Sequence, residues 1–93
     1  ELFYILAGHG ELRLGSERHA VMPGDVIGCP IGGAEIAHQL INTGNEPLQY
    51  LSISSNLDPE VCEYPDSQKV GIWVDKFSYL VRSNSPVDYW DGE

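Results

Sequence analysis

Two side chains with the chemistry to hold a cation together, Glu1 and His38, stand in stretches that alternate like β-strands. Residues two apart in a strand share a face. The residues that would share the inward faces of Glu1 and His38 carry no charge: Phe3, Ile5, Ala7, Leu40 and Asn42. A carboxylate facing an imidazole in such an interior is costly unless the two groups pair or bind a cation. The pattern therefore predicts either a hydrogen-bonded pair or half of a metal site.

Glycine and proline stand at fixed distances from His38. Five residues separate Gly24 from Pro30, and one separates Pro30 from Gly32. Three residues separate His38 from Asn42. We expect Gly24 to serve a turn with positive φ, and Pro30 to end a strand.

A second spacing precedes the first, because Glu1 is followed after six residues by Gly8. Over about residues 1–54 the two spacings resemble the two signature motifs of the cupin superfamily. The first motif is His-x-His, three or four residues, Glu, six residues, Gly. The second is Gly, five residues, Pro-x-Gly, two residues, His, three residues, Asn. The resemblance implies an all-β double-stranded β-helix, or jelly-roll barrel, in which Glu1 and His38 are two ligands of one divalent metal.

The sequence departs from these motifs in two places. Five residues, 33–37, separate Gly32 from His38 where the family has two, an insertion that loops tolerate but that would reshape the barrel mouth. The two histidines of the first motif would lie before Glu1, so we expect the chain to be a fragment of a longer polypeptide. With them, the intact protein would have three nitrogens and one oxygen, a set that suits Mn, Fe, Ni, Zn or Cu. The fragment without them is expected to hold half of the site or no metal. The alternative is that Glu1 is a frayed terminus and that His38 forms a hydrogen bond within the core.

Short strand-like runs predict the barrel that would position these groups. Six such runs fall between residues 1 and 54, separated by turn residues, a spacing typical of a sandwich or barrel. Among them, Val26–Cys29 is expected to be a short buried strand. No window shows a 3.6-residue apolar period, so we predict no helix longer than about two turns.

The composition of the chain changes after Ser55. Residues 56–69 are polar and contain prolines, and we expect an irregular excursion there. Val70–Val74 and Phe77–Val81 predict a hairpin around residues 75–76. We therefore predict one domain over residues 1–93, with its barrel core in residues 1–55. Four aromatic residues of the last segment are expected to be core or interface rings: Trp73, Tyr79, Tyr89 and Trp90.

Composition and charge exclude several classes of protein. The longest apolar stretch, Leu2–Ala7, is far shorter than the roughly 20 residues of a membrane helix. The net charge of -9 argues against nucleic acid and anionic membranes as partners. Cys29 and Cys62 form no spaced motif, which predicts reduced thiols in a cytoplasmic protein, with Cys29 buried and inert. His9 and His19 are expected to be exposed.

The sequence leaves two hypotheses for function open. One is a metal-dependent isomerase, epimerase or dioxygenase that acts on a small sugar or carboxylated metabolite. The other is a binding or sensor module that holds a small-molecule ligand without turnover. The sequence shows no second acid/base pair that would distinguish an enzyme from a binding module. We also predict a homodimer, formed through strand edges or the aromatic segment 73–90, because open edges and clustered apolar surface usually mark contacts.

Overall fold

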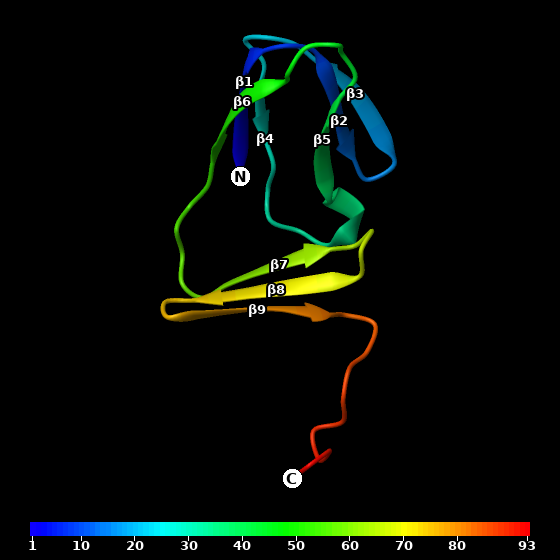
Figure 1. Cartoon of the computed structure of the whole chain (residues 1–93), viewed down its shortest axis with the longest axis vertical. Coiled ribbons are helices and arrows are strands. Elements are labelled where there is room, and N and C mark those ends of the chain that lie inside the picture. The colour runs from blue at the N-terminus through cyan, green and yellow to red at the C-terminus, as the bar shows by residue number, and fades with distance from the viewer. The chain divides into compact units, whose positions relative to one another are not determined.

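A computed structural model describes residues 1–93, which form two compact units, Glu1–Asn56 and Leu57–Glu93 (Figure 1). The first unit contains, in chain order, β1 (Leu2–Ala7), β2 (Gly10–Leu14), β3 (Glu17–Val21), β4 (Val26–Gly28), the 3-10 turn η1 (Ala34–Ile36), β5 (His38–Asn42) and β6 (Gln49–Ile53). The second contains β7 (Glu60–Tyr64), β8 (Lys69–Val74) and β9 (Phe77–Arg82). The all-β prediction is confirmed, and no helix is long and apolar enough to span a membrane.

The first unit consists of two three-stranded antiparallel sheets. One sheet has the strand order β4-β1-β6, and the other has the order β3-β2-β5. Ile5 of the first sheet packs with Leu12 and Val21 of the second, and Ile5 is completely buried. The core therefore lies between the two sheets, as in a jelly-roll barrel. Four partly buried side chains extend it: Leu14, Ile27, Leu40 and Leu48.

Two turns of this unit depend on glycine. Gly8 follows β1 with φ +84°, and Gly24 precedes β4 with φ +94°, both in the left-handed region that glycine adopts without strain. Beside Gly24, the Asp25 carboxylate accepts a hydrogen bond of 2.8 Å from the backbone nitrogen of Met22. The turn role expected for Gly24 is confirmed.

The strand predicted at Val26–Cys29 forms, but the prediction that it is buried is wrong. Val26 is 61% exposed, because it lies on the outer face of its sheet, opposite to Ile27. Only Cys29, just after the end of β4, is buried.

The second unit is an antiparallel meander with the order β7-β8-β9. The predicted hairpin is confirmed. The prediction that residues 56–69 form an irregular excursion is wrong, because this range contains strand β7. This strand pairs with β8, where Val61 lies opposite Ile72. Gly71 is the only buried residue of the unit, and the Trp73 ring packs so closely on it that a Cβ there would collide with the ring.

The four aromatic residues predicted as core or interface rings lie in this second unit. They are between 40% and 79% exposed: Trp73, Tyr79, Tyr89 and Trp90. None is a core ring within this chain. A role at an interface stays a prediction, as does the assignment of residues 1–93 to a single domain.

Candidate functional site

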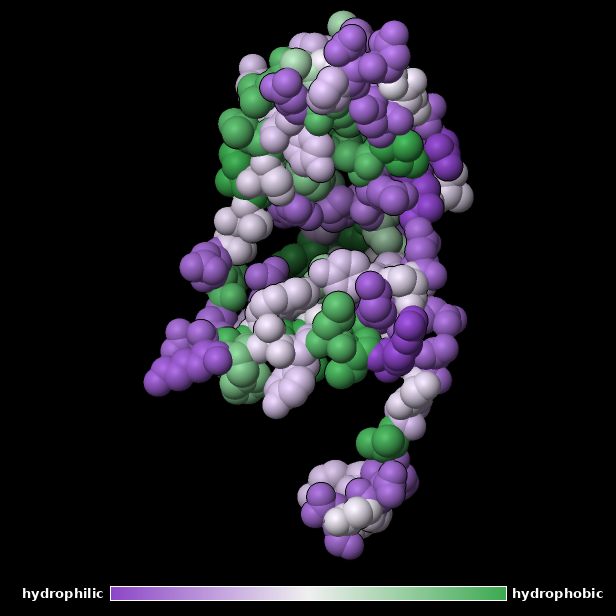
Figure 2. Space-filling view, viewed as in Figure 1, coloured by the Kyte–Doolittle hydropathy of each residue, from purple (hydrophilic) through white to green (hydrophobic).

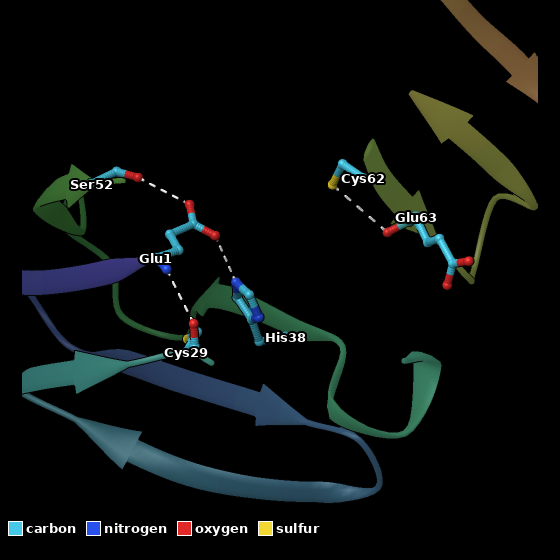
Figure 3. Close-up of polar contacts among 6 residues, drawn as sticks. All are labelled: Glu1, Cys29, His38, Ser52, Cys62 and Glu63. Atoms are coloured by element: carbon cyan, nitrogen blue, oxygen red, sulfur yellow. Dashed lines mark hydrogen bonds and ion pairs between the residues drawn. The ribbon is translucent and has the colours of Figure 1, made fainter. Parts of the chain in front are cut away.

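Glu1 and His38 lie side by side in the first unit, with 2.8 Å between Oε2 of Glu1 and Nε2 of His38 (Figure 3). Glu1 directly precedes β1 of one sheet, and His38 begins β5 of the other. Their contact therefore connects the two sheets that enclose the core. The side chains are 38% and 23% exposed, respectively, so the pair stands at the margin of the interior, within reach of a small ligand.

The backbone of Glu1 is held in the sheet. Its nitrogen donates to the Cys29 carbonyl at 3.1 Å, and the Cys29 nitrogen donates to the Glu1 carbonyl at 2.7 Å. These bonds continue the pairing of β1 with β4, in which Leu2 lies opposite Gly28. Glu1 is thus paired and not frayed, and the hydrogen bond of His38 is made to Glu1 at the margin of the interior rather than within the core.

Ser52 orients the carboxylate of Glu1. Its hydroxyl donates to Oε1 of Glu1 at 3.2 Å, while Oε2 faces His38. Ser52 lies on β6 directly opposite Phe3 of β1, which places it on the same face of the sheet as Glu1. The two carboxylate oxygens therefore have different partners, and the group is fixed in one orientation.

Aromatic rings support the imidazole of His38. The Phe3 ring meets it edge-to-face, with 5.7 Å between centroids and 67° between planes. Phe3 also meets the Tyr50 ring edge-to-face, with 5.6 Å between centroids and 87° between planes. Edge-to-face pairs of this kind are favourable and have a preferred geometry. The rings therefore help to hold the plane of the His38 imidazole.

Cys29 is a free, buried cysteine beside Glu1. Burial raises the pKa of its thiol above the usual value, and the negative charge of Glu1 raises it further, while the nearby amino group acts in the opposite direction. A thiol that keeps its proton is a poor nucleophile and a poor metal ligand. The expectation that Cys29 is buried is confirmed, and the raised pKa supports its inertness.

The remaining candidate residues lie elsewhere. His9 is exposed, and His19 of β3 is exposed with its Nε2 3.5 Å from a carboxylate oxygen of Glu17. Both histidines were expected at the surface, and the structure confirms this.

Asn42 differs from its prediction. It was expected to point into the barrel with His38, but it is exposed and its side chain closes the turn after β5. Its amide nitrogen donates to the Glu46 carbonyl at 2.9 Å, and its amide oxygen accepts from the Gly44 nitrogen at 3.0 Å. Asparagine is well suited to such turns, and this local role takes precedence over the strand alternation.

Glu1 and His38 have the donor atoms for part of a metal site. A carboxylate oxygen and an imidazole nitrogen are donors that first-row divalent metals accept. No third His, Cys, Asp or Glu side chain joins them in a group that could hold a metal ion. The pair therefore fits a metal as two ligands and leaves the other coordination positions to groups outside this pair.

Comparison with known proteins agrees with this architecture. An uncharacterized protein of Methanocaldococcus jannaschii is 37% identical over 67 residues, which make up 68% of this chain and 51% of that protein. A candidate sugar phosphate isomerase of Acidithiobacillus ferrooxidans, known from its crystal structure, is 30% identical, with a TM-score of 0.80. That match covers 94% of this chain and 55% of the other. The chain thus spans about half the length of either relative.

The part of the chain that holds the site is also the part that identifies its family. The sequence profile of the Cupin domain family matches residues 1–54. This range contains both sheets of the first unit, the core between them, and the Glu1–His38 pair. The resemblance seen in the spacing of its glycines, prolines and histidine is therefore confirmed, and the chain belongs to the cupin family.

Proposed function

We propose that this cupin domain binds one divalent transition metal through Glu1 and His38, together with a small metabolite, a sugar or a carboxylate. The observation that carries the proposal is the 2.8 Å approach of the carboxylate to the imidazole across the two sheets. Two strands far apart in sequence are needed to bring these groups together, and three further contacts hold Glu1 in place. Such support of metal ligands by a second set of hydrogen bonds is typical of metal sites.

The residues of the chain would fix the geometry in which a ligand is held. Ser52 holds one oxygen of Glu1 and leaves the other directed at His38. The Tyr50 ring, which is 42% exposed, presents surface near this polar pair, while Phe3, which contacts both His38 and Tyr50, is buried. A small number of oriented polar groups next to aromatic surface is characteristic of metabolite sites. A bound metal would supply a Lewis acid for a carbonyl or hydroxyl oxygen, or a centre that binds O2.

The reaction best supported is isomerisation or epimerisation of a small sugar. The support is similarity to the candidate sugar phosphate isomerase, at 30% identity over 94% of this chain. A dioxygenase would use the same ligand types. The free thiols of Cys29 and Cys62 favour a reducing, cytoplasmic setting for either activity.

A second candidate is a binding or sensor module without turnover. It is favoured by the Glu1–His38 contact, which gives Oε2 of Glu1 and Nε2 of His38 a partner without a metal. Such a module would hold the same metabolites against the exposed Tyr50 ring.

The proposal is tested first by calorimetric titration, with Zn²⁺ and with Mn²⁺, of the protein that carries its native N-terminus. We expect one site per chain, and a loss of affinity of about tenfold or more in Glu1→Gln, since an amide replaces an anionic ligand. Glu17→Gln is the matched control, because Glu17 also lies beside a histidine, on the surface. Equal affinities in Glu1→Gln and Glu17→Gln would contradict the metal site.

Turnover is separated from binding by NMR of a hexose phosphate in D2O. Signals of the other isomer indicate isomerisation, in which the C2 hydrogen of the aldose moves to C1 of the ketose. Line broadening of the sugar without signals of a product indicates the binding module. No change in either signal would exclude hexose phosphates as the ligand.

A further inference from the structure

An inserted turn leads directly into the strand that carries His38. Five residues separate Gly32 from His38 where the cupin motif has two, and the surplus of three equals the length of η1. Figure 1 shows this turn at the start of β5. Ala37 alone separates the two elements, and its nitrogen donates to the Ala34 carbonyl at 3.2 Å. A displacement of η1 would therefore be passed to the backbone of His38.

Apolar burial does not hold this turn in place. None of its residues is buried, and residues 30–35 are exposed. The neighbouring turn between β2 and β3 is also outside the core, because residues 16–20 are exposed. In Figure 2 hydrophilic residues gather along the side of the first unit where β3 runs. The position of η1 must therefore come from hydrogen bonds and close backbone contacts with its neighbours.

Gly15, between β2 and β3, makes these contacts with the inserted turn. Its nitrogen donates to the Ala37 carbonyl at 2.9 Å, which continues the pairing of β2 with β5 one step beyond Leu14 and His38. Its Cα lies so near η1 that a Cβ would stand 2.5 Å from the carbonyl oxygen of Glu35. Glycine leaves room for this close approach, whereas a backbone carbonyl cannot move aside as a flexible side chain can.

Contacts within the inserted segment hold its other end. The Ile36 nitrogen donates to the Gly33 carbonyl at 3.2 Å, and the Gly33 nitrogen donates to Oε1 of Glu35 at 3.3 Å. The Ile36 side chain folds over Gly32 and occupies the space that a Cβ on Gly32 would need. The inserted segment is therefore held at both ends, by Ile36 on Gly32 and by the hydrogen bond of Gly15.

We propose that η1, held by Gly15, positions His38 at the Glu1 carboxylate, so that Gly15 and Ile36 are positioning residues of the site. His38 and Glu1 are 2.8 Å apart, and a backbone shift of about 1 Å is enough to break such a hydrogen bond. The inference rests on the proposed function where it concerns metal affinity. It rests on the Glu1–His38 contact alone where it concerns the geometry of the pair.

The first test uses metal-free protein with its native N-terminus and follows the NMR signal of the Cε1 proton of His38 at one fixed pH. In otherwise unchanged protein, Glu1→Gln should move this signal, since the carboxylate lies beside the ring. In Gly15→Ala the same Glu1→Gln change should move it far less, because the added Cβ displaces η1 and with it His38.

Gly24→Ala is the matched control for the NMR test. Gly24 shares the positive φ of Gly15, but a Cβ added to Gly24 meets no atom within 4 Å. The effect of Glu1→Gln on the His38 signal should therefore be kept in Gly24→Ala. An effect that is equally large in Gly15→Ala and Gly24→Ala would overturn the proposal.

A second pair of variants decides the question if Gly15→Ala does not fold. Ile36→Ala removes the side chain that folds over Gly32, and Ile31→Ala is its control, since Ile31 in the same segment is fully exposed. The effect of Glu1→Gln on the His38 signal should shrink in Ile36→Ala and be kept in Ile31→Ala. Equal effects in these two variants would contradict a positioning role for the turn.

Calorimetric titration with Zn²⁺ extends the test to metal affinity. We expect a loss of about tenfold in Gly15→Ala, the size typical for loss of support to a metal ligand, and no loss in Gly24→Ala. Equal affinities in Gly15→Ala and Gly24→Ala would count against the proposal. If the unchanged protein binds no Zn²⁺, the proposed function fails, and the NMR comparison on metal-free protein still decides this inference.

Discussion

The Glu1 carboxylate divides its two oxygens between different strands: Oε1 accepts from Ser52 of β6, and Oε2 faces Nε2 of His38 on β5. A carboxylate held in this way cannot rotate freely, so Oε2 stays directed at His38. At the scale of single residues, Ser52 is thus a positioning residue for the proposed metal site.

Ser52→Ala should weaken binding of Zn²⁺ about tenfold, because loss of an outer hydrogen bond to a metal ligand typically costs roughly 10- to 100-fold in affinity. Calorimetric titration measures the change. Ser78→Ala is the matched control, a serine on strand β9 in the other unit. Unchanged affinity in Ser52→Ala would show that the hydroxyl does not orient the ligand.

Cys29 gives a second prediction at this scale. Burial and the charge of Glu1 both raise the pKa of its thiol, so the thiolate that reacts with alkylating reagents forms only above the usual pH. This raised pKa also lowers the stability of the fold as pH rises, because the unfolded thiol loses its proton first. In metal-free protein, Glu1→Gln should move the onset of Cys29 alkylation to lower pH. The pH profile of Cys62 in the same sample is the internal control, and an unmoved Cys29 profile would contradict the assignment.

Sequence spacing was enough to find Glu1 and His38, but not Ser52 and Tyr50. Strand β6 alternates apolar and polar residues, and the usual pattern would place Leu51 and Ile53 inside. The structure does the opposite, with Leu51 49% and Ile53 53% exposed. The pattern misleads here because the outer face of this sheet is itself apolar, so alternation no longer identifies the interior.

At the scale of elements, the turn at Gly8 is constrained both by its backbone conformation and by close contact. A Cβ on Gly8 would strike the carbonyl oxygen of Pro47, in the neighbouring connection between β5 and β6. Gly24 has a similar positive φ, but a Cβ added there would meet no other atom within 4 Å. Substitution of Gly24 therefore tests backbone strain alone, whereas substitution of Gly8 tests strain together with a steric collision.

Gly24→Ala should lower the free energy of unfolding by about 1 kcal/mol, the cost of a left-handed alanine. Gly8→Ala should lower it by about 3 kcal/mol, because overpacking adds to that cost. Urea denaturation followed by circular dichroism measures both values. Equal losses would mean that the connection between β5 and β6 shifts freely to make room.

Strand β7 shows why the second unit was harder to predict than the first. Its sequence, Glu60–Tyr64, has two glutamates in five residues and a proline on each side, which locally favours an irregular segment. Its strand conformation comes from pairing with β8, where Glu63 lies opposite Val70. Such pairing between segments is tertiary information that a local pattern does not contain. In the first unit, by contrast, glycine and proline mark nearly every turn.

At the scale of the whole molecule, the family match and the fold divide the chain at nearly the same place. The Cupin domain match ends at residue 54, and the first compact unit ends at Asn56. This unit contains the buried core and both members of the candidate metal pair. The second unit has a single buried residue, Gly71, so its sheet gains little stability from a core of its own.

Bound metal in protein that carries its native N-terminus, measured by mass spectrometry after equilibrium dialysis against Zn²⁺, tests the proposed cupin metal site most directly. His38→Ala and His19→Ala are compared with the unchanged chain, since both histidines lie beside a glutamate but only His38 stands between the two sheets. We predict about one metal ion per chain in the unchanged protein and in His19→Ala, and a large loss in His38→Ala. Equal metal content in His38→Ala and the unchanged chain would contradict the site.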